Sequence, residues 1–232
     1  MTAFVLGATG FVGREVVRQL CVRGARAIAH VRPDSARLEE WRGRFAALGA
    51  EVDATPWDAD RLGARLAELR PAQLYILIGT TRRRARADRV EGDIYEAVDL
   101  GLTQLAVRAA QAARAAQAAP RLVYLSSIGA DPAARSPYLR ARGKAEAAVT
   151  AAGLPWVIAR PSFIVGERDE SRPGERVAGV VGDGVLAVAG LFGARRTRDR
   201  YRSTTPDVLA SALIRLGEAP EHDRIADGAE LR

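Results

Sequence analysis

Short apolar segments alternate with helical patterns along most of this chain, and this alternation limits the folds that the chain can form. The apolar segments are AFVLG, ARAIAHV, EVDAT, QLYILIG, RLVYLSS and PWVIARP. Helical patterns cover residues 11–23, 35–48, 59–69, 90–118 and 138–152. Near-continuous apolar strands separated by helices are typical of a parallel sheet covered on both faces. With right-handed crossovers, the sequence predicts an α/β fold with a doubly wound parallel sheet, the Rossmann arrangement.

A glycine-rich segment, GATGFVG, lies between the first predicted strand and the first predicted helix. Gly7 permits a tight turn, Gly10 lets the backbone approach a pyrophosphate, and Gly13 allows the helix to pack closely on the strand. Free N–H groups and a partial positive charge at the start of the helix attract phosphates. The segment therefore predicts dinucleotide binding, with contacts from Gly7, Thr9, Gly10, Phe11, Val12 and Gly13.

The end of the second strand predicts which dinucleotide binds. NAD-binding proteins usually place an acid about twenty residues after the glycine turn, where it holds the ribose 2′-hydroxyl. No acid occurs between Glu15 and Asp34, and Val31 and Arg32 stand at the strand end. A guanidinium there would bind a 2′-phosphate through two hydrogen bonds. We therefore predict NADP(H) rather than NAD, with Val31 and Arg32 as contacts, and expect Asp34 and Ser35 to cap the next helix.

Two alternatives remain open at this position. Arg32 could be one surface arginine among many, since 35 residues are Lys or Arg and only Lys144 is lysine. Asp34 could instead contact the ribose itself. The charge of +7 favours anionic partners in general. We expect no nucleic-acid partner, because the chain has no basic helix interleaved with aromatic residues. The tract RRRAR, residues 82–86, is interpreted as a solvated loop, with phosphate contact as the alternative.

Cysteine and histidine are too rare for several classes of site. Cys21 is the only cysteine, so an intrachain disulfide is impossible and a thiolate metal site is not expected. His30 and His222 are the only histidines, which argues against a histidine-based hydrolase. No metal is predicted. No export signal is recognisable at the start of the sequence, and the expected location is cytoplasmic.

The pattern changes after Pro161. A stretch of small apolar residues, 177–193, precedes an arginine-rich segment and a last predicted helix over residues 206–217. Asp183 and several glycines interrupt the apolar stretch, so we expect no membrane span there. We expect it to cover a substrate cleft or a subunit interface. Residues 1–232 are thus predicted to form a single NAD(P)-binding Rossmann domain, in which residues 161–232 contribute a small helical cap on the substrate side.

A second motif follows the fifth predicted strand, in the segment LSSIGADPAARSPYLRARGK. Two serines end the strand, and Tyr138 opens a helix. Reduction of a carbonyl needs a proton donor beside it while a nicotinamide delivers a hydride. We predict Tyr138 as that donor and Ser127 as the group that holds the carbonyl oxygen, with Ser126 as its substitute. The structural alternatives are that the serines cap a turn and that the tyrosine packs a helix start.

The position four residues after Tyr138 is the unusual one. Residues four apart in a helix lie on nearly the same face, whereas residues six apart do not. Arg142 therefore shares the face of Tyr138, and Lys144 lies on another face, where we interpret it as a solvated charge near Glu146. Arg142 would supply a permanent cation and hydrogen bonds to ribose hydroxyls, but it cannot relay protons. We predict a modified site with lowered activity, and a binding protein without turnover is the alternative.

Four blocks together resemble the atypical short-chain dehydrogenase/reductases, in particular the branch typified by the Tat-interactive oxidoreductase family. They are GATGFVG, LIGTTR (Leu77 to Arg82), LSSIGAD with Tyr138-Leu139, and RPSFIVGERDESRPGE (Arg160 to Glu175). The resemblance implies an NADPH-binding fold and a serine–tyrosine–lysine site, and this chain departs from it at Arg142. It also implies that the cofactor cleft is lined by Ile78, Gly79, Thr80, Thr81, Ile164 and Arg172.

The alternatives for these implied residues are structural. Arg172 could form an ion pair with Glu170 or Glu175, and Ile78 and Ile164 could be plain core residues. From all of this we predict an NADP(H)-dependent oxidoreductase that reduces the carbonyl of a small molecule. The alternative is a non-catalytic NADP(H)-binding regulator or redox sensor. Other expectations are no membrane span and a homodimer.

Overall fold

A computed structural model describes residues 1–79, 93–165 and 203–232 of the chain. Their strands form one parallel, seven-stranded sheet in the order β3-β2-β1-β4-β5-β6-β7. The strands are β1 (Thr2–Leu6), β2 (Arg26–His30), β3 (Glu51–Asp53), β4 (Gln73–Ile76), β5 (Arg121–Leu125), β6 (Trp156–Arg160) and β7 (Arg224–Asp227). The order reverses between β1 and β4, as in the Rossmann fold. The predicted fold class is confirmed.

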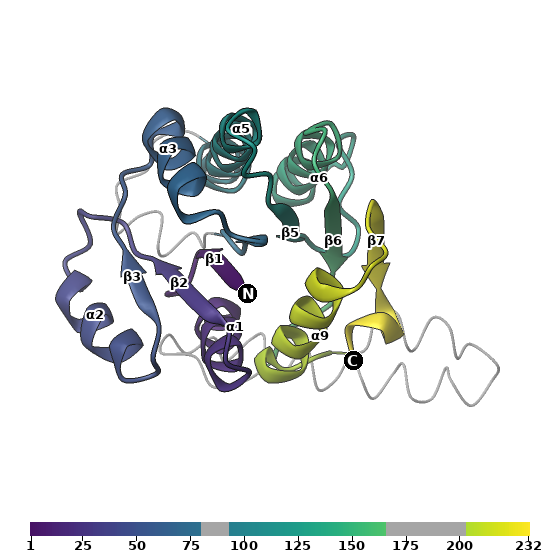
Figure 1. Ribbon diagram of the computed structural model, residues 1–232. Helices are drawn as coiled ribbons and strands as arrows, with labels where there is room; N and C mark the ends of the chain where they lie inside the picture. The colour runs from purple at the N-terminus through teal and green to yellow at the C-terminus, as the bar shows by residue number, and fades with distance from the viewer. Residues whose placement is uncertain (80–92, 166–202) are drawn as a thin grey trace.

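Helices cover both faces of the sheet (Figure 1). One face carries α1 (Phe11–Val22), α2 (Leu38–Ala46) and α9 (Pro206–Glu218), and the other carries α3 (Ala59–Leu69), α5 (Gly101–Ala115) and α6 (Pro137–Thr150). Alternate residues of each strand point to opposite faces. In β1, accordingly, Ala3 and Val5 belong to the core under α1 and α9, while Phe4 and Leu6 belong to the core under α3, α5 and α6.

The predicted helix over residues 90–118 has an irregular start. A π-helix, η1 (Tyr95–Leu100), leads directly into α5. Single turns of π-helix are rare and occur often at functional sites. η1 packs against α6, so it lies beside the segment that carries Tyr138.

The C-terminal part extends the sheet layers. α9 begins at Pro206, as the sequence predicts, with Thr205 as its N-cap residue, and β7 adds a seventh strand that was not predicted. A 3-10 turn, η2 (Gly228–Leu231), ends the chain. Of the region expected to form a cap, residues 203–232 thus supply a helix and a strand of the main domain. Residues 166–202, which include the apolar stretch 177–193, lie outside the described residues.

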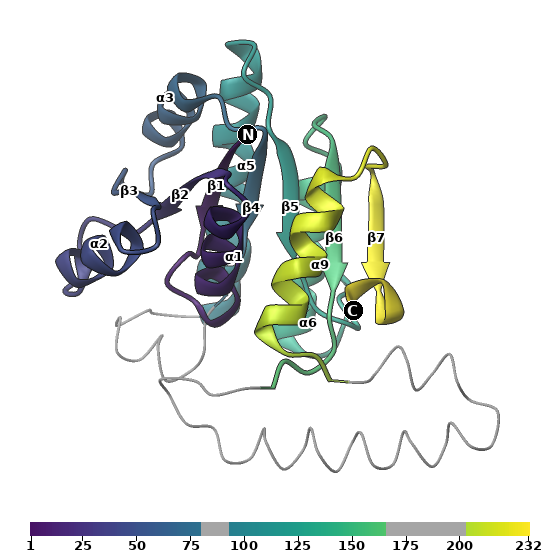
Figure 2. The same ribbon diagram turned by 60° about the horizontal axis from the view of Figure 1, so that its bottom comes forward.

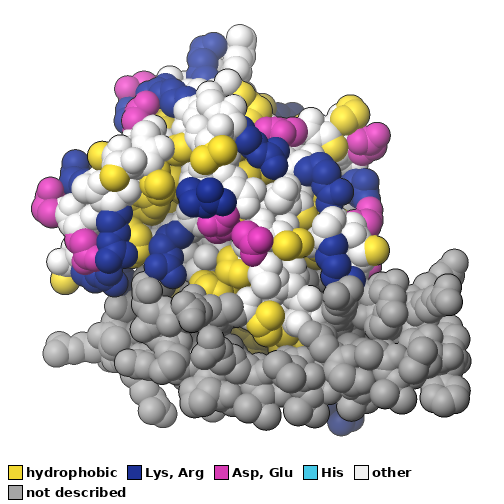
Figure 3. All heavy atoms as spheres, turned by 90° about the horizontal axis from the view of Figure 1, so that it is seen from below, with side chains coloured by type: hydrophobic (Ala, Val, Ile, Leu, Met, Phe, Trp, Pro, Cys, Tyr) yellow, Lys and Arg dark blue, Asp and Glu magenta, His cyan; other side chains and the backbone are white. Residues whose placement is uncertain are grey.

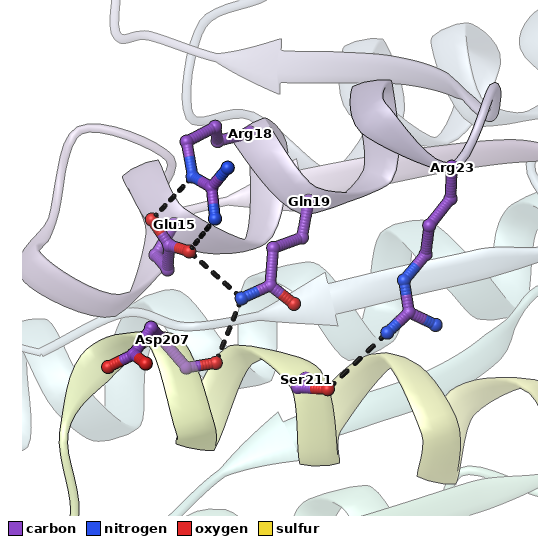
Figure 4. A network of polar contacts seen from close by, with 6 residues as sticks. All are labelled: Glu15, Arg18, Gln19, Arg23, Asp207 and Ser211. Carbon is purple, nitrogen blue, oxygen red and sulfur yellow. Dashed lines mark hydrogen bonds and ion pairs between the residues drawn. The ribbon is translucent and has the colours of Figure 1, made fainter.

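A polar network fixes α9 against α1 (Figure 4). The amide of Gln19 donates to the Asp207 carbonyl at 2.8 Å and to the Glu15 carboxylate at 2.9 Å. Further along the two helices, Arg23 donates to the Ser211 hydroxyl at 3.4 Å. The hydrogen bond from Arg18 holds the pKa of Glu15 below its ordinary value, although burial opposes it. These contacts join segments far apart in the sequence at the rim of the apolar core.

Charges of both signs are mixed on the side of α1, α2 and α9 (Figure 3). Lys and Arg side chains there lie beside Asp and Glu side chains instead of forming one basic stripe. Two of the helical pairs on α2 are Arg37–Glu40 at 2.7 Å and Arg44–Glu40 at 2.8 Å. No helix within residues 1–79, 93–165 and 203–232 is long and apolar enough to cross a membrane. The tract 82–86 lies outside these ranges.

Candidate active site at the carboxyl edge of the sheet

The carboxyl ends of the parallel strands meet at one edge of the sheet, which we call the carboxyl edge. Figure 2 shows β6 and β7 pointing toward it. Nearly all the described residues that the sequence predicts for the site lie at this edge. They follow β1, β2, β4, β5 and β6. In open α/β sheets, ligands bind outside this edge at the point where the strand order reverses. That point lies between β1 and β4.

The turn after β1 has no room for a side chain at Gly7 or at Gly13. Gly7 has φ +80°, and a Cβ on it would lie 2.6 Å from the Leu77 carbonyl oxygen of the neighbouring strand end. The Gly10 amide donates to the Gly7 carbonyl at 2.9 Å, closing the turn. A Cβ on Gly13 would lie 2.2 Å from the Gly7 oxygen. α1 is therefore packed directly on the turn, as the spacing of the glycines predicts.

The start of α1 offers donors to an anion. Its N-cap is Gly10, without a side-chain cap, and its first turn contains no acidic residue. The first N–H groups of a helix have no partner within the helix and carry a partial positive charge. Thr9 and Phe11 beside them are half-buried, and Val12 is buried. A glycine cradle that ends in a helix N-terminus without a side-chain cap fits the pyrophosphate of a dinucleotide.

The end of β2 differs in part from expectation. Val31 is buried, and its amide donates to the Asp53 carbonyl at 2.9 Å. Arg32 is 38% exposed, and its Nε lies 3.7 Å from the Asp34 carboxylate. The prediction that Asp34 and Ser35 cap α2 is wrong, because the N-cap residue is Arg37 and no side-chain cap is formed. The Asp34 side chain lies near Arg32 instead.

The end of β4 adjoins a buried cation. Ile78 is buried and Gly79 is exposed. A Cβ on Gly79 would lie 2.7 Å from Nη2 of Arg142, so the guanidinium occupies the space that a side chain at position 79 would take. Thr80, Thr81 and Arg172, also expected in the cleft, lie outside the described residues.

The end of β5 supplies the two serines. Ser126 is 4% exposed, and its amide donates to the Ala159 carbonyl of β6 at 2.8 Å. Ser127 is half-buried, and its hydroxyl donates only a long bond, 3.4 Å, to the Ile128 carbonyl. Ser127 is thus held at the edge by the chain on either side of it, with a hydroxyl that is weakly engaged.

Tyr138 stands at the start of α6. Ser136 caps this helix by accepting from the Leu139 amide at 3.5 Å, and Pro137 occupies its first position. The Tyr138 ring is half-buried and meets the Tyr95 ring edge-on, with centroids 5.4 Å apart. Within the described residues, no hydrogen bond joins Tyr138 to Ser127. The two groups share the carboxyl edge, and their roles in catalysis stay predictions.

Arg142 lies on the Tyr138 face of α6, as the helix geometry predicts, but its guanidinium has other partners than the expected ones. Its guanidinium is paired with Asp99 of η1 at 2.7 Å and donates to the Leu125 carbonyl at 2.8 Å and the Tyr124 hydroxyl at 3.2 Å. The side chains of Arg142 and Asp99 are only 6% and 0% exposed. Both terminal nitrogens are therefore engaged inside the protein, whereas the sequence analysis expected them to donate to a ribose.

The environment keeps this guanidinium charged. Burial lowers the pKa of Arg142, but Tyr124, Tyr138 and Asp99 together outweigh burial, so the pKa stands above its ordinary value. Its Cζ lies 5.4 Å from the Tyr138 ring centroid and 5.8 Å from the Tyr124 ring centroid, which is cation–π distance. Arg142 is thus a buried cation between two tyrosines.

Lys144 lies on a different side of α6 from Arg142, as the helix geometry predicts. Its ammonium pairs with Glu96 of η1, and both side chains are about half exposed. The expected neighbour, Glu146, is instead 5% exposed and forms a two-pronged pair with Arg160 of β6. The lone lysine therefore links α6 to η1 at the surface.

The sequence analysis missed Asp99. A signal was available, because Asp99 lies on the same stripe of its helix as Thr103, Ala106 and Ala110, all of which are buried. A carboxylate on a buried helix face requires a charged or hydrogen-bonding partner. The partner could not be identified from the sequence, since it lies on α6 and pairs with Asp99 only through the fold.

Ile164, the last described residue of the predicted site, follows β6. It pairs with Thr204 in a parallel bridge and is half-buried against the core under α1 and α9. Phe163 beside it is 54% exposed. The segments that enter and leave the undescribed residues 166–202 are thus paired at the carboxyl edge.

The sheet order, the glycine cradle and the helix N-terminus define an NAD(P)-binding Rossmann protein. The model of a family described as NAD(P)H-binding matches residues 7–184. The chain belongs to this NAD(P)H-binding family. The expected resemblance to short-chain dehydrogenase/reductases is confirmed at that level.

The most similar relatives that were compared span nearly the whole chain. Protein fmp52, mitochondrial, of Aspergillus fumigatus is 34% identical over 234 residues, which cover 97% of this chain and 91% of the relative. Protein FMP52, mitochondrial, of Coccidioides immitis is 28% identical, covering 99% and 90%. The expected cytoplasmic location is contradicted, because these relatives are named mitochondrial. That expectation rested on the absence of an export signal, and an absence does not determine a location.

Solved structures share the fold at low sequence identity. An oxidoreductase of the short-chain dehydrogenase/reductase family from Burkholderia thailandensis has a TM-score of 0.66 and 19% identity, covering 97% of this chain and 89% of that one. The Bordetella bronchiseptica enzyme WbmH in complex with NAD+ has a TM-score of 0.65 and 15% identity, covering 99% and 77%. At this identity the similarity establishes the fold alone.

Proposed function

We propose that the protein is an NADP(H)-dependent oxidoreductase that reduces the carbonyl group of a small molecule. One observation carries the proposal: Ser127 and Tyr138 lie at the same carboxyl edge as the glycine turn of β1. A proton donor and an oxygen-binding hydroxyl beside a dinucleotide site form the set of groups that carbonyl reduction needs.

The residues divide into a cofactor part and a chemical part. The turn from Gly7 to Gly13 would hold the pyrophosphate, with Ile78 and Gly79 along the neighbouring strand end. When bound, the reduced cofactor supplies the hydride that the carbonyl carbon accepts. The Ser127 hydroxyl would hold the carbonyl oxygen, and Tyr138 would donate its proton to that oxygen to give the alcohol. Water returns the proton to Tyr138.

Arg32 supports a preference for NADP(H) over NAD(H). Its position at the end of β2, with 38% of the side chain exposed, suits a guanidinium that binds a 2′-phosphate. Asp34 alone at this position would favour a free ribose hydroxyl, but its nearness to Arg32 directs its charge toward the guanidinium.

The cofactor assignment is tested by fluorescence titration of the wild type and of Arg32→Ala with NADPH and NADH. A charge-assisted contact of roughly 1.5–3 kcal/mol predicts an NADPH preference of about ten-fold or more, which Arg32→Ala should largely remove. Arg42→Ala, an exposed arginine on α2 paired with Glu39, should keep the preference. Equal affinities of the wild type for NADPH and NADH would contradict this assignment.

The catalytic assignment is tested with Tyr138→Phe on a panel of carbonyl compounds, followed by loss of NADPH absorbance. Removal of the hydroxyl alone should abolish turnover and leave NADPH affinity unchanged. Retained turnover in Tyr138→Phe would remove Tyr138 from the mechanism.

A second candidate function is an NADP(H)-binding regulator without turnover. The observation that favours it is that Arg142 stands where a lysine was expected and that its guanidinium is engaged with Asp99, Tyr124 and Leu125. If wild type binds NADPH but oxidises none with any carbonyl compound tested, this candidate replaces the first.

A further inference from the structure

The most unusual charged group in the described residues is the buried pair between Asp99 and Arg142. Moving two charges out of water is costly, and apolar residues of similar volume often stabilise a fold as well or better. Stability alone therefore does not account for the presence of this pair. It lies beside Tyr138, in the part of the carboxyl edge where the chemistry is proposed.

The contacts of Arg142 show what the pair holds in place. The guanidinium contacts Asp99 of η1 and Leu125 and Tyr124 of β5. It also fills the space that a side chain at Gly79, at the end of β4, would take. On α6 itself, its Cζ lies 5.4 Å from the centroid of the Tyr138 ring. η1 contributes a second contact to that ring through Tyr95. The same two segments, η1 and α6, thus hold both the ion pair and the tyrosine.

We infer that Asp99 is a positioning residue that fixes the Tyr138 ring through Arg142. Its carboxylate neutralises and orients the guanidinium, which then packs against the Tyr138 ring on one side and the end of β4 on the other. The inference deepens the proposed function, since the position of Tyr138 affects turnover only if Tyr138 is the proton donor. Asp99 itself contacts neither cofactor nor substrate in this account.

A structural role and a positioning role make different predictions, and α6 provides a matched control. Glu146 lies one turn after Arg142, is equally buried at 5%, and pairs with Arg160. None of its described contacts reaches Tyr138. Glu146→Gln and Asp99→Asn each remove one buried carboxylate from an ion pair, so both should lower the unfolding temperature. Only Asp99→Asn should disturb the tyrosine.

Two measurements decide the inference, both below the unfolding temperature of every variant. The first is near-ultraviolet circular dichroism of the cofactor-free protein, which reports the packing of tyrosine rings. The second is the separation of kcat from the KM for NADPH. Because small displacements of reacting groups cost up to about a hundred-fold in rate, Asp99→Asn should lower kcat by roughly ten- to a hundred-fold, with a smaller change in KM, and weaken the tyrosine dichroism.

Glu146→Gln should keep kcat within about two-fold of wild type and keep the dichroism. The inference is overturned if Asp99→Asn matches wild type in both measurements, or if Glu146→Gln loses as much. If Asp99→Asn does not fold, the double variant Asp99→Asn/Arg142→Gln, which removes both charges, takes its place. Wild-type kcat and dichroism in that variant would equally overturn it.

The dichroism also separates this inference from the proposed function. If wild type turns over no carbonyl compound, the proposed function fails, and the dichroism then decides whether Asp99 positions Tyr138. Because Tyr124 contacts the same guanidinium, the signal lost in Asp99→Asn must be the one that Tyr138→Phe also loses. A weakened tyrosine signal in Asp99→Asn, with an unchanged signal in Glu146→Gln, supports the inference in that case too.

Discussion

The turn after β1 and the junction of η1 with α6 lie at the same edge of the sheet but are built in different ways. The turn is made of backbone atoms: Gly7, Gly10 and Gly13 bring main chain within contact of main chain. The junction is made of side chains: Asp99, Arg142 and the rings of Tyr124 and Tyr138 fill it. One site thus combines a part that tolerates no side chain with a part that depends on one buried pair.

This difference explains which part could be predicted. Backbone sterics act between residues close in sequence, so the glycine spacing alone predicted the turn. The pairing of Asp99 with Arg142 joins residues that only the packing of η1 on α6 brings together. A local pattern contains no information about such a partner.

The largest effect is expected at Gly13. A Cβ there would lie 2.2 Å from the Gly7 oxygen and 2.9 Å from the Ala8 Cα, both backbone atoms. Because no side-chain rotation can relieve this clash, Gly13→Ala should lower the free energy of unfolding by about 3 kcal/mol or more and abolish NADPH binding. Chemical denaturation and a binding titration measure the two effects.

The control for Gly13 is another glycine inside a helix. A Cβ on Gly43 of α2 would meet nothing within 4 Å, so Gly43→Ala should stabilise the protein by roughly 0.5–1 kcal/mol. If Gly13→Ala and Gly43→Ala had the same effect on the free energy of unfolding and on NADPH binding, the backbone packing at the turn would not be rigid.

A smaller effect is expected at Gly79, where the two parts meet. A Cβ there would lie 2.7 Å from Arg142 Nη2 and 3.7 Å from the Asp99 carboxylate. The neighbour is now the end of a side chain, but its buried partners hold it, so Gly79→Ala should cost about 1–3 kcal/mol in denaturant unfolding. The cost should nearly vanish in an Arg142→Ala background, because the guanidinium is gone.

The Gly79 cycle sharpens the comparison because it measures coupling directly. Contacting residues give interaction free energies of roughly 0.5–3 kcal/mol in such cycles. If the losses in the free energy of unfolding of Gly79→Ala and Arg142→Ala simply add, the end of β4 is not coupled to the ion pair. The two parts of the site would then be independent.

The same distinction applies to the rest of the fold. Six of the seven described strands and the start of α9 at Pro206 were predicted, since apolar runs and the starts of helices leave local signals. β7 (Arg224–Asp227) was missed because it is short and its apolar character is weak. The capping role expected for Asp34 was wrong, because α2 begins only at Leu38, with Arg37 at the N-cap position.

The smallest effect concerns His30, a buried side chain at the end of β2 whose charged form is disfavoured by burial. Its Nε2 donates to the Thr55 carbonyl at 2.7 Å, and the residue is 3% exposed. Burial lowers the pKa of His30 below its ordinary value of 6.5, against the opposing effects of the Thr55 hydrogen bond and the charge of Asp53. Below pH 6.5 the unfolded chain therefore binds a proton that the folded protein does not, and stability falls as the pH falls.

The slope should stay below about 1.4 kcal/mol per pH unit, the limit for one proton. Urea unfolding between about pH 7.5 and about pH 5.5 measures it, above the range where the carboxylates titrate. His30→Gln should flatten the slope, whereas His222→Gln, at an exposed residue, should keep it. If His30→Gln kept the wild-type slope, another group would titrate in this range. The expected contrast in pH dependence would then be lost, because neither His30 nor the Asp99–Arg142 pair would make stability depend on pH in this range.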